Sequence, residues 1–185
     1  LKFFPNKDSF DYEAFINVVQ TMIIAQDILI DNSGYPTELI KENSMNYRPL
    51  GAGYTNLGAV LMYLGLSYDS DEGRDLAALL TAFETGVAYL TSNELANRLG
   101  SFKHFERNES SFYNVLNKHA SSVSKLLDKT QDKFNNRFPS IKNFVKDVWN
   151  KITAKIQNQE LFRNGTVTLL APTGTISSLM QAATT

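Results

Sequence analysis

The sequence has 185 residues, of which 43% are hydrophobic and 20% charged, and its net charge at pH 7 is −1. This composition predicts one globular domain, and it gives no bulk electrostatic reason to expect nucleic acid or an anionic membrane as a partner. The absence of cysteine excludes disulfides, thiolate metal sites and cysteine nucleophiles. With His104 and His119 as the only histidines, a histidine-rich metal centre is not expected. No apolar run reaches the ~18 residues that span a bilayer, so we expect no membrane segment.

The first predicted element is a helix that begins at a cap at Asp8 or Ser9 and ends at the turn-forming residues 32–34. A brief helix can follow from Glu38 to Asn43, between two turns that contain proline. The first helix is expected to be largely buried, because its apolar residues recur mostly every three or four positions. These residues are Phe15, Val18, Val19, Met22, Ile23, Leu29 and Ile30.

A glycine-rich segment, residues 48–58, comes next. It resembles a dinucleotide-binding loop superficially, but it lacks a strong preceding strand and the G-x-G-x-x-G spacing, which excludes that interpretation. We predict a short strand from Leu50 to Tyr54 and a helix from Asn56 to Leu64. Acidic residues between Asp69 and Gly73 could suggest calcium, but the distal ligands of a calcium loop are missing. The segment is better explained as a capped helix start with acidic residues in the first turn.

Three further helical segments are predicted from apolar spacing. The helix that starts near residue 70 is expected to be interrupted at Thr91 or Ser92, to continue from Glu94 and to stop at Gly100. A second helix, from Asn108 to about Leu127, contains His119, and a lone histidine on a helix is more often structural than catalytic. Residues 125–136 are polar and read as a linker, after which Pro139 starts a third helix that extends to Ile156.

The last segment reads as a strand, a tight turn and the start of a helix. The apolar run Val167 to Ala171 ends at Pro172, and a Thr-Gly-Thr turn leads into a helix-compatible sequence. Such a turn presents backbone N–H groups and hydroxyls, which bind phosphate in many proteins. An ordinary strand-to-helix connection with Ser and Thr caps explains the same residues. Two short strands, each followed by a helix, predict a helix-rich α/β fold.

Three segments together resemble one family. Asn46–Arg74, Phe105–Glu109 and Phe162–Ser177 are similar in order and spacing to class II, adenosylcobalamin-dependent ribonucleotide reductases, and the resemblance covers essentially the whole chain. The Ala-Pro-Thr-Gly-Thr-Ile-Ser stretch is specific, because class I relatives typically have Pro-Thr-Ala-Ser-Ser/Thr-Ala at this loop. The resemblance implies that residues 1–185 are a middle-to-late portion of a ten-stranded α/β barrel built around a finger loop.

The resemblance also implies chemistry and partners. Enzymes of this family reduce ribonucleotides by radical chemistry: adenosylcobalamin generates a thiyl radical on a finger-loop cysteine, and a cysteine pair supplies the reducing equivalents. Implied partners are a ribonucleoside di- or triphosphate, the remainder of the barrel and a thioredoxin-like reductant; a homodimer and a cytoplasmic location are also compatible. The residues assigned to substrate phosphate binding are Pro172, Thr173, Gly174, Thr175 and Ile176.

The lack of cysteine limits this interpretation. The radical cysteine and the redox pair would lie elsewhere in the enzyme, so we expect a portion of a longer protein that is inactive alone. An alternative is a non-catalytic, reductase-like protein that binds nucleotide or a reductase partner. An unrelated hydrolase-like α/β domain has little support, because neither a G-x-S-x-G elbow nor a plausible triad is visible.

Overall fold

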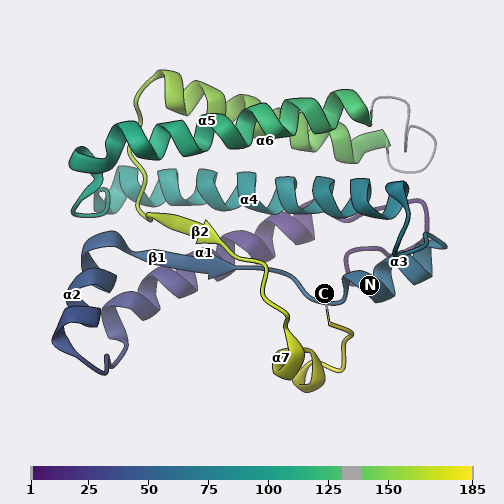
Figure 1. Ribbon diagram of the computed structural model, residues 1–185, viewed down its shortest axis with the longest axis horizontal. Coiled ribbons are helices and arrows are strands. Elements are labelled where there is room, and N and C mark those ends of the chain that lie inside the picture. Colours follow the sequence, from purple (N-terminus) through teal and green to yellow (C-terminus); the bar gives the residue numbers. More distant parts are fainter. Residues whose placement is uncertain (1, 131–138, 185) are drawn as a thin grey trace.

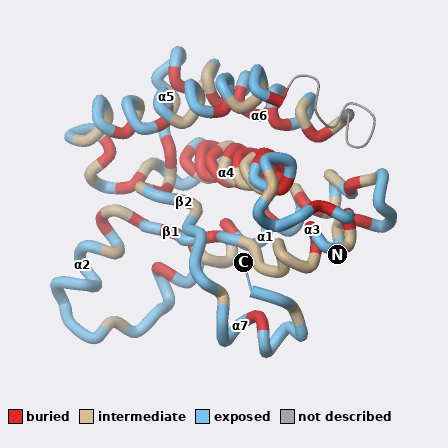
Figure 2. Tube along the Cα trace, turned by 45° about the vertical axis from the view of Figure 1, so that its right-hand side comes forward, coloured by how far each residue is buried: buried red, intermediate tan, exposed pale blue. Residues whose placement is uncertain are grey.

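A computed structural model describes residues 2–130 and 139–184. Helix α4 lies in the middle of the fold (Figure 1). The outer helices α5 and α6 pack on one side of it, and α1 with the strands β1 and β2 packs on the other side. Most of α4 is buried, whereas α2 and α7 are largely exposed (Figure 2). In chain order the elements are α1 (Tyr12–Asn32), α2 (Glu38–Tyr47), β1 (Pro49–Ala52), α3 (Leu57–Leu64), α4 (Asp71–Leu99), α5 (Phe105–Lys129), α6 (Pro139–Gln157), β2 (Thr166–Thr168) and α7 (Gly174–Leu179).

Helix α4 begins as the sequence predicts but is not interrupted. The Ser70 hydroxyl caps it by accepting a hydrogen bond from the Gly73 N–H at 3.0 Å, which confirms the interpretation of residues 69–73 as a helix start. The expected break at Thr91 or Ser92 is wrong. The Thr91 hydroxyl donates to the carbonyl oxygen of Val87 at 2.8 Å, and the helix continues through it to Leu99.

Close packing joins α4 to α6. A Cβ atom at Gly86 would lie 2.3 Å from Cγ1 of Val148, so the backbones approach more closely than any larger residue would permit. The indole N–H of Trp149 donates to the carbonyl oxygen of Ala82 at 2.8 Å. Fully buried side chains from three helices fill this part of the core: Leu76, Leu79, Phe83, Leu116, Ile141 and Ile152.

Helix α1 differs from its prediction in where it starts and in how much of it is buried. Asp11, rather than Asp8 or Ser9, caps the helix by accepting from the Ala14 N–H at 3.0 Å. The expectation of a largely buried helix is also wrong. One face, which includes Phe15, Ile23 and Ile30, packs in the core against α4 and β1, but the opposite face is exposed. Its exposed apolar side chains are Val18, Met22, Ile24, Ile28 and Leu29.

Within the described residues, α1 is also the one helix long and apolar enough to cross a membrane by length and composition. The sequence expectation of no such run is therefore corrected. A search for uninterrupted apolar residues misses this helix, because it includes isolated polar positions such as Asp27. Core helices of soluble proteins can pass the same test, and one face of α1 packs against α4 and β1.

The two strands form a parallel pair. Pro49 is paired with Thr166 and Ala52 with Thr168, with an irregularity between them, and the Leu169 N–H donates to the Ala52 carbonyl at 2.8 Å. Each strand is followed by a helix, which agrees with the predicted helix-rich α/β class. Both strands are shorter than predicted.

The remaining boundaries differ modestly from their predictions. Helix α2 extends beyond the predicted Asn43, and α3 begins just after its N-cap residue Asn56. Helix α5 starts at Phe105 and continues through Lys129, so the first residues of the predicted linker are helical. Residues 131–136 of that linker lie outside the described residues. Helix α6 starts at Pro139, as predicted.

Candidate phosphate-binding site

The carboxyl ends of β1 and β2 lie at the same edge of the parallel pair. The loop 53–56 leaves β1 toward α3, and the segment 169–173 leaves β2 toward α7 (Figure 1). In open α/β sheets, ligands bind outside the carboxyl ends of parallel strands. The predicted phosphate-binding residues are therefore at the edge where a ligand site is expected.

The five predicted residues form one contiguous turn. Thr173 is the N-cap residue of α7, in the left-handed region at φ 55°, and its side chain makes no capping bond to the helix. The Ser177 N–H closes the first helical turn on the Thr173 carbonyl at 2.9 Å. Thr173 is half-buried, whereas Pro172, Gly174, Thr175 and Ile176 are exposed. The turn can thus be reached from solvent in the described structure.

No charged residue occurs in residues 49–68 or 164–185, the segments that surround this turn. A phosphate here would meet no carboxylate from either segment. Its binding would depend on backbone N–H groups and hydroxyls, because α7 has six residues and contributes a short dipole. A Cβ atom at Gly174 would meet no atom within 4 Å, so the space in front of the turn is open.

Sequence reasoning missed Thr55, which contacts this turn, and Asn56, which contacts the segment that follows α7. Thr55 Oγ1 lies 3.1 Å from Thr173 Oγ1, and Asn56 pairs with Ala183 just beyond α7. The sequence holds no local signal for these contacts, because Thr55 and Thr173 are 118 positions apart.

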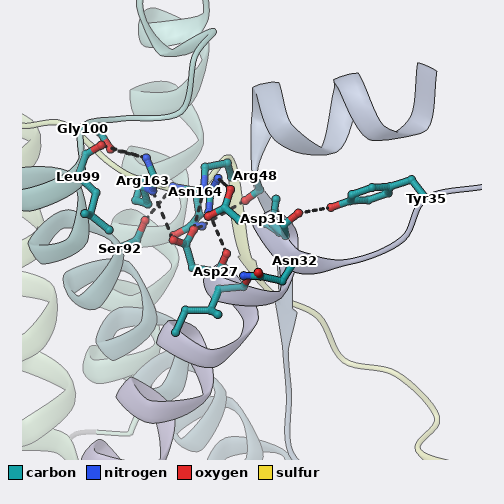
Figure 3. A network of polar contacts seen from close by, with 12 residues as sticks. Asp27, Asp31, Asn32, Tyr35, Arg48, Ser92, Leu99, Gly100, Arg163 and Asn164 are labelled. Atoms are coloured by element: carbon teal, nitrogen blue, oxygen red, sulfur yellow. Dashed lines mark hydrogen bonds and ion pairs between the residues drawn. The ribbon is translucent and has the colours of Figure 1, made fainter. Parts of the chain in front are cut away.

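A buried charged network lies at the opposite ends of the strands (Figure 3). Arg48, just before β1, donates from Nε to Asp27 Oδ1 at 2.8 Å, and its two terminal nitrogens bind Asp31 at 2.8 and 2.9 Å. The hydrogen bond from Arg48 lowers the pKa of Asp31. Asp27 occupies a core-facing position between Ile23 and Ile30 on α1. An acidic residue at an apolar position of a helix is the sequence signal that could have predicted the network.

The same network reaches the start of β2. Asn164 Nδ2 donates to Asp27 Oδ1 at 2.8 Å, and the Asn164 N–H donates to the hydroxyl of Ser92 on α4 at 3.0 Å. Arg163 approaches the other Asp27 oxygen at 3.4 Å. The Asp27 carboxylate on α1 therefore binds the residues that precede both strands, and it fixes the position at which each strand begins.

Two other titratable groups lie away from these contacts: Glu84 is buried and His119 is half-buried. Burial raises the pKa of Glu84 on α4 to about 7, and its Oε2 has no hydrogen-bond partner among the described residues. Burial lowers the pKa of His119, whose ring lies 6.3 Å from the rings of both Tyr89 and Trp149. Within residues 2–130 and 139–184, no group of three His, Asp or Glu side chains could hold a metal ion.

A family model described as "Ribonucleotide reductase, barrel domain" matches residues 1–185. The chain belongs to the ribonucleotide reductase barrel-domain family. A protein from Rhodopirellula baltica named "Vitamin B12-dependent ribonucleotide reductase" is 41% identical over 100% of this chain and 17% of its own length. Proteins with the same name from Streptantibioticus cattleyicolor and Agrobacterium fabrum are 37% and 34% identical, each over 96% of this chain and over 28% and 14% of their own lengths.

These matches confirm the family that the sequence resembles. The chain spans under a third of the length of these reductases. It matches the barrel domain of these enzymes. In the described residues, this portion contains one pair of parallel strands, each followed by a helix.

Proposed function

We propose that this chain forms part of an adenosylcobalamin-dependent ribonucleotide reductase, which converts ribonucleotides to deoxyribonucleotides. The observation that carries this proposal is the barrel-domain match over the whole chain, together with relatives named as B12-dependent reductases. Within that enzyme we assign the phosphates of a ribonucleoside di- or triphosphate to Pro172, Thr173, Gly174, Thr175 and Ile176. Their place at the carboxyl ends of parallel strands supports the assignment.

We further propose that β1 and β2 are two strands of a ten-stranded barrel completed by residues outside this chain. Exposed apolar side chains on the segments that follow the two strands support this arrangement, because burial of such groups stabilises an assembled domain. Leu169 is 62% exposed, Met62 79% and Leu179 83%. The rest of the barrel would cover these side chains and the free edges of the strands.

The described residues do not form a site that fits adenosylcobalamin. His119 is packed beside Tyr89 and Trp149, and a groove of about 470 Å³ lies on the outer layer between α5 and α6, away from the strand ends. We therefore assign the contacts of the cofactor to other parts of the enzyme. The cysteines of the reaction must also come from there, since this chain has none. A thioredoxin-like reductant, a homodimer and a cytoplasmic location are further expectations for that enzyme.

Calorimetric titration of the full-length protein with CDP tests the assigned loop. Gly174→Val should abolish binding, because the valine side chain would fill the open space in front of the turn. Gly34→Val is the matched control, since a Cβ at Gly34 also meets nothing within 4 Å but lies between α1 and α2. Unchanged CDP affinity in the Gly174→Val variant would show that the loop assignment is wrong.

Product analysis separates the two functional candidates. The full-length protein should form deoxynucleotide when it is supplied with adenosylcobalamin and a dithiol, and residues 1–185 alone should form none. CDP binding by the full-length protein without any turnover would instead support the non-catalytic alternative.

A further inference from the structure

The loop after β1 holds the segment after β2 through two side chains. The Thr55 hydroxyl donates to the Ala183 carbonyl oxygen at 2.7 Å and lies 3.1 Å from the Thr173 hydroxyl. A hydroxyl has one proton to donate. Since Thr55 gives its proton to Ala183, Thr173 must be the donor in the hydroxyl pair. The Thr173 hydroxyl is thus engaged with the Thr55 hydroxyl.

Asn56 makes a second, two-point connection to the same segment. Its backbone N–H donates to the Ala183 carbonyl oxygen at 2.9 Å, and its side-chain Oδ1 accepts from the Ala183 N–H at 2.8 Å. Asn56 adopts the left-handed conformation, with φ 73°, which asparagine tolerates better than most residues. The chain before α7 is therefore held at Thr173, and the chain after it at Ala183.

The two loops also meet too closely for larger residues. A Cβ atom at Gly53 would lie 2.3 Å from the carbonyl oxygen of Leu169. The Leu169 N–H is bonded to Ala52, directly before that glycine. The close approach continues the parallel pairing up to the point where Thr55 and Asn56 make their contacts.

Packing contributes little to the position of α7. Ser177 is its one buried residue, while Leu179 and Met180 are 83% and 61% exposed. With so few core contacts, the conformation of the turn depends on the bonds at its two ends.

We propose that Thr55 and Asn56 are positioning residues that hold the Pro172–Ile176 turn in its phosphate-binding conformation. The inference rests on the proposed function of that turn. Thr173 then has a different role from Thr175: its hydroxyl secures the turn to Thr55, and phosphate contacts come from the backbone N–H groups and the exposed Thr175 hydroxyl.

Calorimetry on the full-length protein with CDP, and separately with inorganic pyrophosphate, tests the proposal. Thr55→Val removes the hydroxyl at nearly constant shape, and Asn56→Gly keeps the left-handed conformation but removes the Oδ1 acceptor. Each should raise the Kd for both probes about tenfold, as expected when one or two hydrogen bonds that order a binding loop are lost. Thr55→Ser keeps the hydroxyl and should bind within about twofold of the parent, since its hydrogen bonds can still form.

Thr85→Val is the matched control. Thr85 and Thr168 form a comparable hydroxyl pair at 3.2 Å between α4 and β2, before the turn, so its loss should leave CDP affinity unchanged. Amide hydrogen exchange gives an independent readout: Asn56→Gly should speed exchange at Ala183, while Thr85→Val should not. In steady-state assays, Thr55→Val and Asn56→Gly should raise KM with little change in kcat, the pattern of lost substrate binding.

The possible results distinguish a failure of the positioning role from a failure of the phosphate-loop assignment. If Gly174→Val abolishes CDP binding but Thr55→Val and Asn56→Gly bind normally, the positioning role is wrong and the phosphate loop stands. If Gly174→Val also binds CDP normally, the loop assignment itself fails. Equal losses in Thr55→Ser and Thr55→Val would likewise overturn the role of the Thr55 hydroxyl.

Discussion

Arg48 and Asp27 form a buried ion pair in which Arg48 Nε donates to Asp27 Oδ1 at 2.8 Å, with each residue 4% exposed. Arg48 ends α2 and precedes β1, and Asp27 belongs to α1. The same Asp27 oxygen accepts from Asn164, two positions before β2. Both strands therefore begin at one carboxylate, while the candidate site lies at their other ends.

Asp27→Ala should destabilise the protein by about 3–5 kcal/mol, because it leaves the Arg48 guanidinium buried with part of its charge uncompensated. The free energy of unfolding from urea denaturation of the full-length protein measures this. Asp69→Ala is the control: Asp69 is also paired with an arginine, Arg74, but its side chain is 96% exposed. That change should cost less than about 1 kcal/mol. Equal effects of the two substitutions would contradict the structural role of the buried pair.

Glu84 makes stability depend on pH. Burial raises the pKa of its carboxyl group to about 7, above the ordinary value of 4.5. The folded state therefore holds its proton where the unfolded chain has released it, so stability falls as pH rises from about 4.5 to 7. Below about pH 4.5 Glu84 does not lower the free energy of unfolding, and above about pH 7 it lowers this free energy by about 3 kcal/mol.

Glu84→Gln should remove this cost, because glutamine stays neutral. The gain in unfolding free energy over the parent should appear at pH 8 and be largely absent at pH 4.5, as measured by urea denaturation at both values. Glu72→Gln, at an exposed position on the same helix, should give no such pH-dependent difference. A gain for Glu84→Gln that is equal at both pH values would refute the role of ionisation.

Gly86→Ala should destabilise the protein by about 1–3 kcal/mol, despite the higher helix propensity of alanine. The new Cβ would lie 2.3 Å from Val148 Cγ1, and α4 and α6 would have to separate. Combining it with Val148→Ala removes the clashing atom, so the double variant should lose less stability than the two single costs added together. Gly58→Ala on α3 is the control, because its Cβ meets nothing within 4 Å, and it should gain up to about 1 kcal/mol. Thermal unfolding of the four variants measures each effect.

The sequence predicted features that depend on neighbouring residues and missed those that depend on distant ones. Apolar spacing located the longer helices and α3, whereas α2 was expected from the turns that flank it and the turn at Pro172–Ile176 from its own residues. The break expected at Thr91 was wrong because a β-branched hydroxyl residue can also bond back to its own helix, as it does to Val87. Burial of α1 was overestimated because periodicity identifies apolar faces but not whether each face has a neighbour.

The polar contacts that the sequence did not predict also join residues that are far apart in the chain. Asp27 and Asn164 are 137 positions apart, and Asn56 and Ala183 are separated by 127. No spacing rule reaches such distances, since these pairs meet only after the strands have aligned in parallel. The candidate phosphate loop could therefore be predicted from sequence, but the residues that hold it in place could not.

Gly53→Ala tests whether the close approach of the two strand ends matters for the candidate site. The added Cβ would lie 2.3 Å from the Leu169 carbonyl oxygen, a backbone atom that cannot move without displacing the segment that leads into Pro172. We expect CDP affinity of the full-length protein to fall at least about tenfold, because the turn is displaced from the contacts that orient it. Gly51→Ala, two positions earlier in the chain, is the matched control: its Cβ would lie 3.3 Å from the Cβ of Leu169, a contact that a shift of a few tenths of an ångström relieves, so affinity should change less than about threefold. Calorimetry with CDP compares the two variants, and similar affinities would show that the spacing at Gly53 does not control the loop.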